Sequence, residues 1–228
     1  MRIATSPNHG ARRSGFAAPD TIVIHYTAMT GGAGPAIKRL CDPATEVSCH
    51  YIIDEDGTAT RLVPDDLRAW HAGAGRWGAA EDVNSRSLGI ELSNDGFSPF
   101  SAPQMDSLEA LLADLIGRHG IAPHMVIGHS DCAPGRKIDP GGRFDWRRLA
   151  LSGLAVWPGE GTTETDAAAF LRDLATAGWT CPAPPDTLLA ALRLRFRPGH
   201  AGPLDGRDCA IAADMARRFP VDQAALTA

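Results

Sequence analysis

The sequence predicts an α/β (α+β) region followed by a small C-terminal helical domain. Three observations support this fold class. Short β-branched apolar runs alternate with helical periodicity before residue 157, whereas helical spacing alone remains after residue 163. Gly and Pro are plentiful, 24 and 17 of 228 residues, which suits a loop-rich α/β protein rather than a helical bundle. The polar, Gly-rich segment 157–163 separates the two regions, so domains are expected at 1–157 and 163–228.

Five segments before residue 157 have the composition of strands. The first is a short β-branched apolar run, typical of a buried central strand. A turn at 54–57 follows the second segment, and the third segment returns as its hairpin partner. The predicted strands are 21–24, 49–53, 58–63, 87–92 and 125–127.

The clearest helix is predicted to begin after Phe100. Ser101 can cap it, Gln104 can close a capping box, and Phe100 can pack on Met105. A shorter helix is expected at 35–40. The long helix carries one apolar stripe that should face the sheet, formed by Met105, Leu108, Leu112, Leu115 and Ile116. Three helical patterns follow residue 163, marked by Ala167, Phe170, Leu171 and Leu174, by Leu188, Leu189, Leu192 and Phe196, and by Ile211, Met215 and Phe219.

Charge and hydropathy argue against certain partners and cellular compartments. The net charge is −5 and no run of Lys or Arg could follow a phosphate backbone, which argues against nucleic acid. No apolar run approaches the ~18 residues that a membrane span needs. The first residues lack the apolar core of a signal peptide, so a cytoplasmic protein is expected. The oligomeric state stays open, with a monomer favoured.

Cysteine usage agrees with a reducing compartment. The number of cysteines is odd, they are scattered, and none forms a Cys-x-x-Cys pair, so a thiolate zinc site is not expected. Reduced thiols are the simplest interpretation. The five residues are Cys41, Cys49, Cys132, Cys181 and Cys209.

Three polar side chains lie at or after the ends of predicted strands. His25 ends the first strand, His129 follows the last one, and Asp139 lies ten residues further on. Two imidazoles and one carboxylate that leave a coordination position open are typical of catalytic zinc. Each residue alone has an ordinary alternative: a structural histidine at a strand end, or an aspartate in a turn. Spacing alone does not select these three residues among 8 histidines.

Two charged residues are further candidates. Glu91 interrupts the apolar strand 87–92, where an ionised carboxylate is costly unless it is paired or lies in a cleft, the setting of a general base. The alternative places Glu91 on a solvated face, with Ile90 and Leu92 inward. Lys137 lies two residues before Asp139 and, in an extended loop, would project to the same side, where it could stabilise an oxyanion. A solvated loop lysine is the alternative.

Five sequence motifs, which include these candidate residues, occur together in one order along the chain. They lie in order at 22–27, 48–51, 68–73, 84–92 and 128–141. Together they resemble the type 2 N-acetylmuramoyl-L-alanine amidases, a family that includes AmpD- and AmiD-like bacterial enzymes, over residues 18–150. The resemblance implies a mixed central β-sheet flanked by helices, with zinc at the base of an open groove. The C-terminal helices, with Leu204, Asp205 and Gly206, resemble the peptidoglycan-binding-type domain of AmiD-like members.

The resemblance also implies roles for single residues. Zinc would be held by His25, His129 and Asp139, with Glu91 as catalytic base and Lys137 beside the developing oxyanion. Related amidase branches have a cysteine where this chain has Asp139, so the AmpD-like branch fits better; Cys132 is interpreted as a packing residue. The implied substrate-binding residues are Trp70, which could pack on a sugar face, His71, which would line the cleft, and His50 near the site.

The implied reaction is zinc-dependent hydrolysis of the amide between N-acetylmuramic acid and L-alanine in peptidoglycan fragments, as in cell-wall recycling. The implied partner is therefore a muropeptide or peptidoglycan. Two alternatives come from other classes: a module that binds muropeptides without cleaving them, and a metallopeptidase that cuts within the stem peptide. Binding modules of this kind lack a metal ligand, whereas this chain has candidates for all three.

Overall fold

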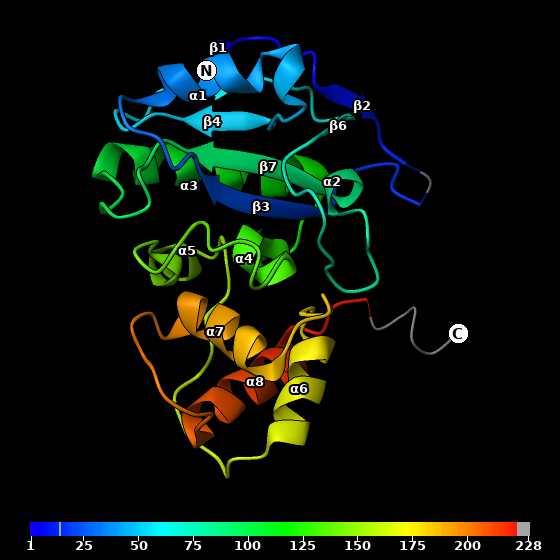
Figure 1. Cartoon of the computed structure of the whole chain (residues 1–228), viewed down its shortest axis with the longest axis vertical. Helices are drawn as coiled ribbons and strands as arrows, with labels where there is room; N and C mark the ends of the chain where they lie inside the picture. Colours follow the sequence, from blue (N-terminus) through cyan, green and yellow to red (C-terminus); the bar gives the residue numbers. More distant parts are fainter. Residues whose placement is uncertain (14, 223–228) are drawn as a thin grey trace.

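The computed structural model describes residues 1–13 and 15–222, and it is built around one mixed β-sheet (Figure 1). Neighbouring strands run parallel except for β4 and β5, which form the predicted hairpin. This confirms the predicted fold class. In spatial order the strands are β1 (Arg2–Ile3), β5 (Ala59–Arg61), β4 (Tyr51–Ile53), β7 (Ser87–Leu92), β3 (Thr21–Tyr26) and β8 (Val126–Gly128). A separate antiparallel pair joins β2 (His9–Ala11) to β6 (Leu67–Ala69).

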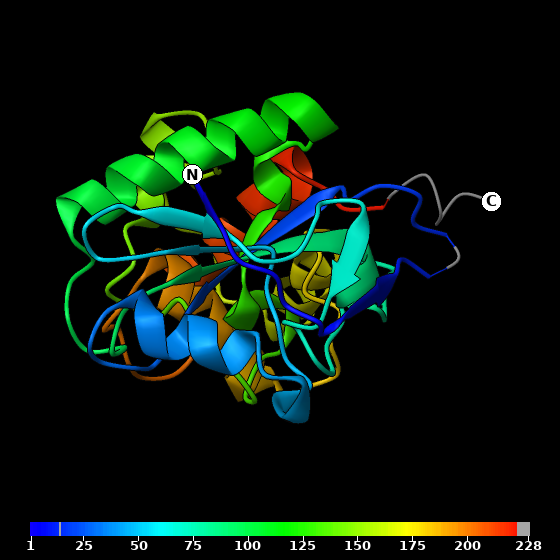
Figure 2. The same cartoon turned by 90° about the horizontal axis from the view of Figure 1, so that it is seen from above.

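Helices cover both faces of the sheet (Figure 2). The long helix α3 (Ala102–His119) covers one face and α1 (Ala33–Leu40) the other. The predicted stripe of α3 is buried against the sheet, with Ile116 partly buried at its end. In β4, Tyr51 and Ile53 pack on the α3 side while Ile52 packs with α1, as the alternation of side chains along a strand requires.

The register of the central strands decides which residues reach the α1 side. Glu91 pairs with Ile52 on one neighbouring strand and with His25 on the other. Directly paired residues point to the same face of a sheet. His25 and Glu91 therefore lie on the same face as α1, while Ile24 and Ile90 lie in the core beneath α3, each with no exposed surface.

The N-terminus of α3 departs from the predicted capping box. Ser101 does cap the helix, since its hydroxyl accepts from the Gln104 backbone N–H at 3.3 Å. The side-chain amide of Gln104 does not return to the cap; it donates to the carbonyl oxygens of Ile53, at 2.9 Å, and Ser93, at 3.0 Å. These carbonyls lie at the ends of the adjacent strands β4 and β7. The two hydrogen bonds from Gln104 therefore attach α3 to the sheet.

Several elements are shorter than predicted or were not predicted. The segment 49–53 forms a strand only over Tyr51–Ile53, and 58–63 only over Ala59–Arg61. The helix expected at 35–40 begins two residues earlier, at Ala33. The missed elements, besides β1, β2 and β6, are short helices: α2 (Val83–Arg86), α4 (His129–Cys132), α5 (Trp146–Leu151), and the 3₁₀ turns Pro43–Thr45 and Pro123–Met125.

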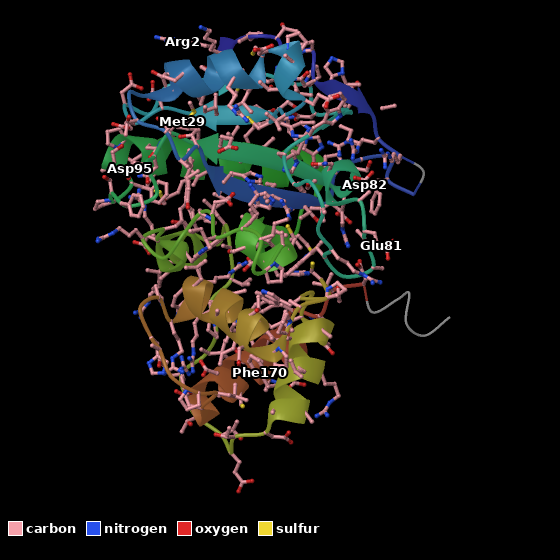
Figure 3. The ribbon with its side chains drawn as sticks, viewed as in Figure 1. Arg2, Met29, Glu81, Asp82, Asp95 and Phe170 are labelled. Carbon is pink, nitrogen blue, oxygen red and sulfur yellow. The ribbon has the colours of Figure 1, made fainter. Side chains whose placement is uncertain are left out.

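Three helices form the C-terminal part of the described chain. They are α6 (Ala167–Thr176), α7 (Pro185–Phe196) and α8 (Gly206–Arg218), which confirms the three helical patterns. Figure 3 shows Phe170 among them, and this side chain is 2% exposed. Their apolar side chains belong to the same buried cluster as those of the sheet. At the junction the Trp77 and Trp179 rings meet edge to face, with centroids 4.9 Å apart.

Two further properties concern the cysteines and the helices of the described residues. All five cysteines are free thiols, and Cys132 is fully buried, as its interpretation as a packing residue required. Within residues 1–13 and 15–222, no helix has the length and apolar character needed to cross a membrane.

Candidate active site

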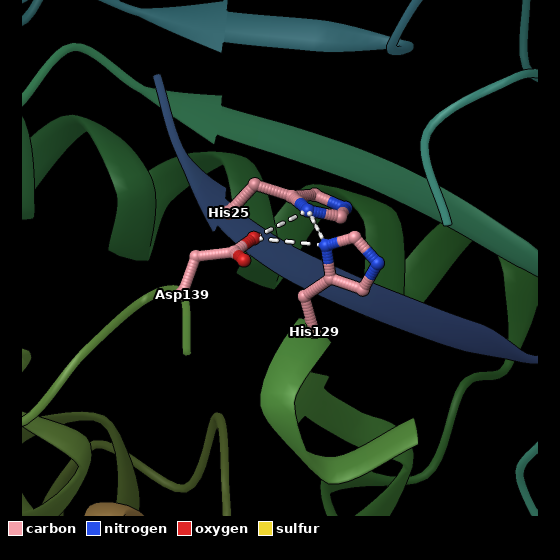
Figure 4. A group of neighbouring side chains, drawn as sticks. All are labelled: His25, His129 and Asp139. Atoms are coloured by element: carbon pink, nitrogen blue, oxygen red, sulfur yellow. Dashed lines mark hydrogen bonds and ion pairs between the residues drawn. The ribbon is translucent and has the colours of Figure 1, made fainter. Parts of the chain in front are cut away.

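Three predicted ligands converge at one edge of the sheet (Figure 4). His25 lies near the end of β3, and His129 begins α4 directly after the parallel neighbour β8, so the two imidazoles leave the sheet at the same edge. Asp139 reaches back from the loop after α4. The Nδ1 atoms of the two histidines are 3.0 Å apart, and Oδ2 of Asp139 lies 2.9 Å from His25 Nδ1 and 3.0 Å from His129 Nδ1.

The donor set and its geometry fit a divalent metal ion. His129 Nε2 lies 2.9 Å from the carbonyl oxygen of Ala72. A carbonyl oxygen can only accept a hydrogen bond, so Nε2 of His129 carries the hydrogen. The lone pair of His129 Nδ1 then faces His25 Nδ1 and Asp139 Oδ2. Three atoms about 3 Å apart share a point about 2 Å from each, the distance at which zinc binds nitrogen and oxygen. A cation at that point would relieve the repulsion between the facing lone pairs.

Electrostatics within the triad agree with this arrangement. Burial alone would raise the pKa of Asp139, but the contacts with His129 and His25 outweigh it and hold the pKa well below its usual range. Burial, with a smaller contribution from the neighbouring His129, lowers the pKa of His25 to about 4 against the opposing effect of Asp139. At neutral pH the site therefore offers an ionised carboxylate and an uncharged His25, the forms that bind a metal.

The triad lies beside a cavity of about 510 Å³. His25 and His129 are each 2% exposed and Asp139 is 8% exposed, so the donors are shielded while the side facing the cavity stays open. The cavity wall also contains four of the predicted site residues: Trp70, His71, Glu91 and Lys137.

Glu91 lies on the strand face opposite the core and also lines a cavity, so each of the two interpretations made from the sequence is partly right. Ile90 and Leu92 are fully buried on the core side, and Glu91 points to the opposite face, which is the wall of the cavity. Its Oε2 atom is buried and has no hydrogen-bond partner. Burial raises the pKa of Glu91 to about 8, with a further contribution from the charge of Asp139 and an opposing one from Lys137. A buried carboxylate of this kind is suited to take up a proton.

His50 occupies a different environment from that of a substrate contact. It has no exposed surface and does not line the cavity. The Gly89 N–H donates to its Nδ1 at 2.9 Å, and its Nε2 donates to the Leu67 carbonyl at 3.0 Å. Both ring nitrogens therefore form hydrogen bonds within the protein. They attach His50, which directly precedes β4, to β7 and to β6. The geometry does not support the predicted contact between His50 and a substrate.

The chain is similar to known amidases. A family profile described as N-acetylmuramoyl-L-alanine amidase matches residues 15–142, more than half of the chain. The chain belongs to this family. It is 32% identical to the N-acetylmuramoyl-L-alanine amidase AmiD of Escherichia coli K12, over 88% of this chain and 83% of AmiD. It is 36% identical to the 1,6-anhydro-N-acetylmuramyl-L-alanine amidase AmpD of Enterobacter cloacae, over 65% of this chain and 87% of AmpD.

Solved structures give the same result for the amidase fold. The complex of E. coli AmiD with anhydro-N-acetylmuramic acid-L-Ala-D-γ-Glu-L-Lys has a TM-score of 0.80 at 32% identity, and covers 91% of this chain and 92% of AmiD. AmpDh3 from Pseudomonas aeruginosa has a TM-score of 0.82 at 28% identity, with 92% and 96% coverage. Both structures therefore cover the C-terminal helices as well as the sheet.

Two arginines of the amidase site were not predicted. Arg136 donates to the carbonyl oxygen of Ala72, at 2.5 Å, and to that of Ala74, and so holds the loop that also accepts from His129. Its position between His129 and Asp139 in the motif 128–141 was the available signal. Arg39 projects from α1, is exposed, and lines the cavity. No sequence motif pointed to it.

Proposed function

We propose that this amidase hydrolyses the amide between N-acetylmuramic acid and L-alanine in soluble peptidoglycan fragments, using zinc held by His25, His129 and Asp139. One observation carries the proposal: two imidazole nitrogens and a carboxylate oxygen lie 2.9–3.0 Å apart beside a cavity that also holds the unpaired carboxylate of Glu91. Bound zinc would lower the pKa of water toward neutrality and polarise the amide carbonyl.

Glu91 is the proposed base. Its carboxylate takes a proton from the attacking water and, once protonated, delivers it to the amine of the leaving L-alanine. The burial that raises its pKa supports this role, because a carboxylate that holds a proton readily can serve in both steps. Lys137, on the wall of the same cavity, is proposed to stabilise the negative charge that develops on the carbonyl oxygen.

The substrate class is proposed from the cavity and from the relatives. Trp70 lines the cavity and is partly exposed, as a side chain that packs on a sugar face must be. AmiD and AmpDh3 have been solved with an anhydro-muramyl tripeptide and an anhydromuramic pentapeptide, respectively. Anhydro-muropeptides are therefore the proposed substrates, with α6–α8, as a helical domain over 163–228, contacting the glycan portion.

The proposed compartment is the cytoplasm, where soluble muropeptides are processed during cell-wall recycling. The five free thiols support a reducing environment. Fractionation of the native host, with detection of the chain beside cytoplasmic and periplasmic markers, tests this assignment. Recovery with the periplasmic marker would contradict it.

The reaction itself is tested by the products of a defined substrate. The purified chain is incubated with an anhydro-muramyl tripeptide and, separately, with intact sacculi, and the products are identified by mass spectrometry. An amidase releases an intact peptide that begins with L-alanine, and we expect faster release from the soluble substrate. A fragment cut within the stem peptide would instead identify a metallopeptidase, and binding without products a recognition module. His129→Ala, which removes a ligand, is the inactive control.

A further inference from the structure

We propose that His71, held in place by Ser87, is the hydrogen-bond acceptor that orients His25 as an Nδ1 metal ligand. The inference rests on the proposed function in one respect, that His25 binds zinc. It assigns His71 a role as a positioning residue, different from the substrate contact that the family resemblance implies. Hydrogen bonds link four groups in order: the carbonyl oxygen of Val83, Ser87, His71 and His25.

The direction of these hydrogen bonds is set at the backbone end. The carbonyl oxygen of Val83 can only accept, and the hydroxyl of Ser87 lies 2.6 Å from it. The single proton of that hydroxyl is therefore directed to Val83. The Ser87 oxygen can then only accept from its other neighbour, Nε2 of His71, at 3.2 Å. His71 consequently carries its hydrogen on Nε2.

The ring of His71 determines in turn which nitrogen of His25 carries a hydrogen. A ring that binds a metal through Nδ1 carries its hydrogen on Nε2, so Nε2 of His25 is a donor facing Nδ1 of His71, which leaves no place for a second hydrogen on the His71 ring. A neutral ring with its hydrogen on Nε2 has an unprotonated Nδ1. This atom lies 3.0 Å from Nε2 of His25, which must donate to it. His25 therefore presents the lone pair of Nδ1 to His129 and Asp139.

The strand β7 is built to accept this arrangement. Ser87, Gly89 and Glu91 are two residues apart and so share the face of β7 that carries the site. Ser87 accepts from His71, and Glu91 lines the cavity. Between them Gly89 leaves room for the imidazole of His71, because a Cβ at this position would lie 2.5 Å from that ring. Any larger residue at 89 would displace His71 from His25.

The backbone of His71 is fixed as well. Its N–H donates to the side-chain oxygen of Asn84 at 2.9 Å, and the next N–H, of Ala72, donates to the same oxygen at 2.8 Å. With both ring nitrogens used, His71 has no polar atom left for a substrate, although it lines the cavity. A ligand-orienting role accounts for all of its polar contacts.

The test measures zinc affinity by chelator competition on the purified full-length chain. Ser87→Ala removes the acceptor for His71, and Ser93→Ala is its matched control: Ser93 directly follows β7, is fully buried, and its hydroxyl has no partner. His71→Leu removes the acceptor for His25, whereas His71→Asn keeps an amide oxygen near the position of Nδ1. Circular dichroism melting confirms that each variant is folded.

We expect Ser87→Ala and His71→Leu to weaken zinc binding by about 10- to 100-fold, the usual effect of losing a hydrogen-bond partner of a ligating histidine. His71→Asn should recover most of the loss, and Ser93→Ala should bind like the wild type. Wild-type affinity in both Ser87→Ala and His71→Leu would overturn the inference, as would a rise in KM with zinc affinity unchanged.

The outcome separates this inference from the proposed function. A wild-type chain that binds no zinc overturns both. A chain that binds zinc, weakens as expected in Ser87→Ala and His71→Leu, but cleaves no muropeptide supports the inference and removes the proposed reaction. A chain that cleaves muropeptide with zinc affinity unaffected by either substitution keeps the reaction and removes the inference.

Discussion

Glu91 lies on β7, whose one face packs in the core and whose other face lines the cavity. Its sequence neighbours Ile90 and Leu92 are fully buried in the core beneath α3, while its own carboxylate enters the cavity next to the triad. A carboxylate placed there without a hydrogen-bond partner for Oε2 is unfavourable for folding. Its retention at this position is understandable if proton transfer, rather than stability, is what the site requires.

The first prediction concerns the reaction. Glu91→Gln keeps the size of the side chain but removes the group that accepts a proton, so kcat should fall by about 10²- to 10⁴-fold. Zinc content should stay at the wild-type level because Glu91 is not one of the three ligands. Turnover is measured with an anhydro-muramyl tripeptide, and zinc by elemental analysis. Wild-type turnover in Glu91→Gln would remove Glu91 from the mechanism.

A second prediction uses the pH dependence of stability in the metal-free protein. The folded-state pKa of Glu91, about 8, is above the ordinary pKa of a glutamate, 4.5. Between these values the folded chain binds more protons than the unfolded chain, so the contribution of Glu91 to stability is lost as pH rises. Glu91→Gln should therefore be more stable than the wild type at pH 9, by about 1–3 kcal/mol, and similar to it at pH 4. Urea unfolding with chelator present measures this difference, and an equal gain at both pH values would contradict it.

At the residue level, the sequence could name the ligands only through the family motifs. His25, His129 and Asp139 are brought together by the pairing of β3 with β8 and by a loop, which no local spacing reveals. Glu91 was visible as a charge in an apolar strand. The contacts of His71 with Ser87 and His25 could not be predicted, because they depend on the packing of a loop over Gly89.

Among the elements, length decides what could be predicted. The helix α3 is long enough to show a stripe and a cap, and both are present. The helix α4 has four residues, too few for periodicity, yet it carries His129. The edge strand β1 and the pair β2 and β6 are two or three residues long and depend on partners far along the chain. Such elements exist through tertiary contacts rather than local preference.

The position of α4 depends on α7. Arg195 of α7 donates to Oδ2 of Asp131 in α4, at 2.5 Å, and to the carbonyl oxygen of Val126 in β8, at 3.1 Å. Its guanidinium lies 4.1 Å from the centre of the Trp146 ring. Arg195 is 3% exposed and Asp131 is fully buried, so solvent cannot replace the pair. The C-terminal helices thereby support the short helix that holds His129.

A third prediction follows for this ion pair. Arg195→Met leaves the Asp131 carboxylate buried without its partner, which should cost about 3–5 kcal/mol of folding free energy. The matched control is Arg217→Met, which removes an exposed guanidinium that pairs with Asp214 and should cost less than about 1 kcal/mol. Denaturant unfolding of both variants makes the comparison. Equal losses in the two variants would show that burial of the Arg195 pair has no special effect.

For the whole molecule, the apolar core extends across the predicted domain boundary. The segment 157–163 has neither helix nor strand, as its composition indicated. The side chains on either side of it nevertheless form one buried cluster, in which Trp77 contacts Trp179. Composition reveals connectors but not the faces that pack across them, so the sequence could not show this continuity.

A fourth prediction tests that continuity. A chain that ends at residue 157 would expose the apolar surface that α6–α8 cover, including that of Trp77, which is 1% exposed in the whole chain. We expect the fragment to aggregate or to melt well below the full chain, because exposed apolar patches of this kind promote association. Light scattering and thermal melting measure the two effects. A monomeric fragment with the melting temperature of the full chain would show that 1–157 folds independently.

Zinc K-edge X-ray absorption of the purified, zinc-loaded chain measures the first coordination shell directly, and so tests the metal site on which the proposed reaction depends. The account predicts one zinc per chain, with nitrogen and oxygen neighbours at about 2.0–2.1 Å, two of them imidazoles, and no sulfur shell at about 2.3 Å. This signal should be lost in His129→Ala. A sulfur shell, or an unchanged spectrum in His129→Ala, would contradict it.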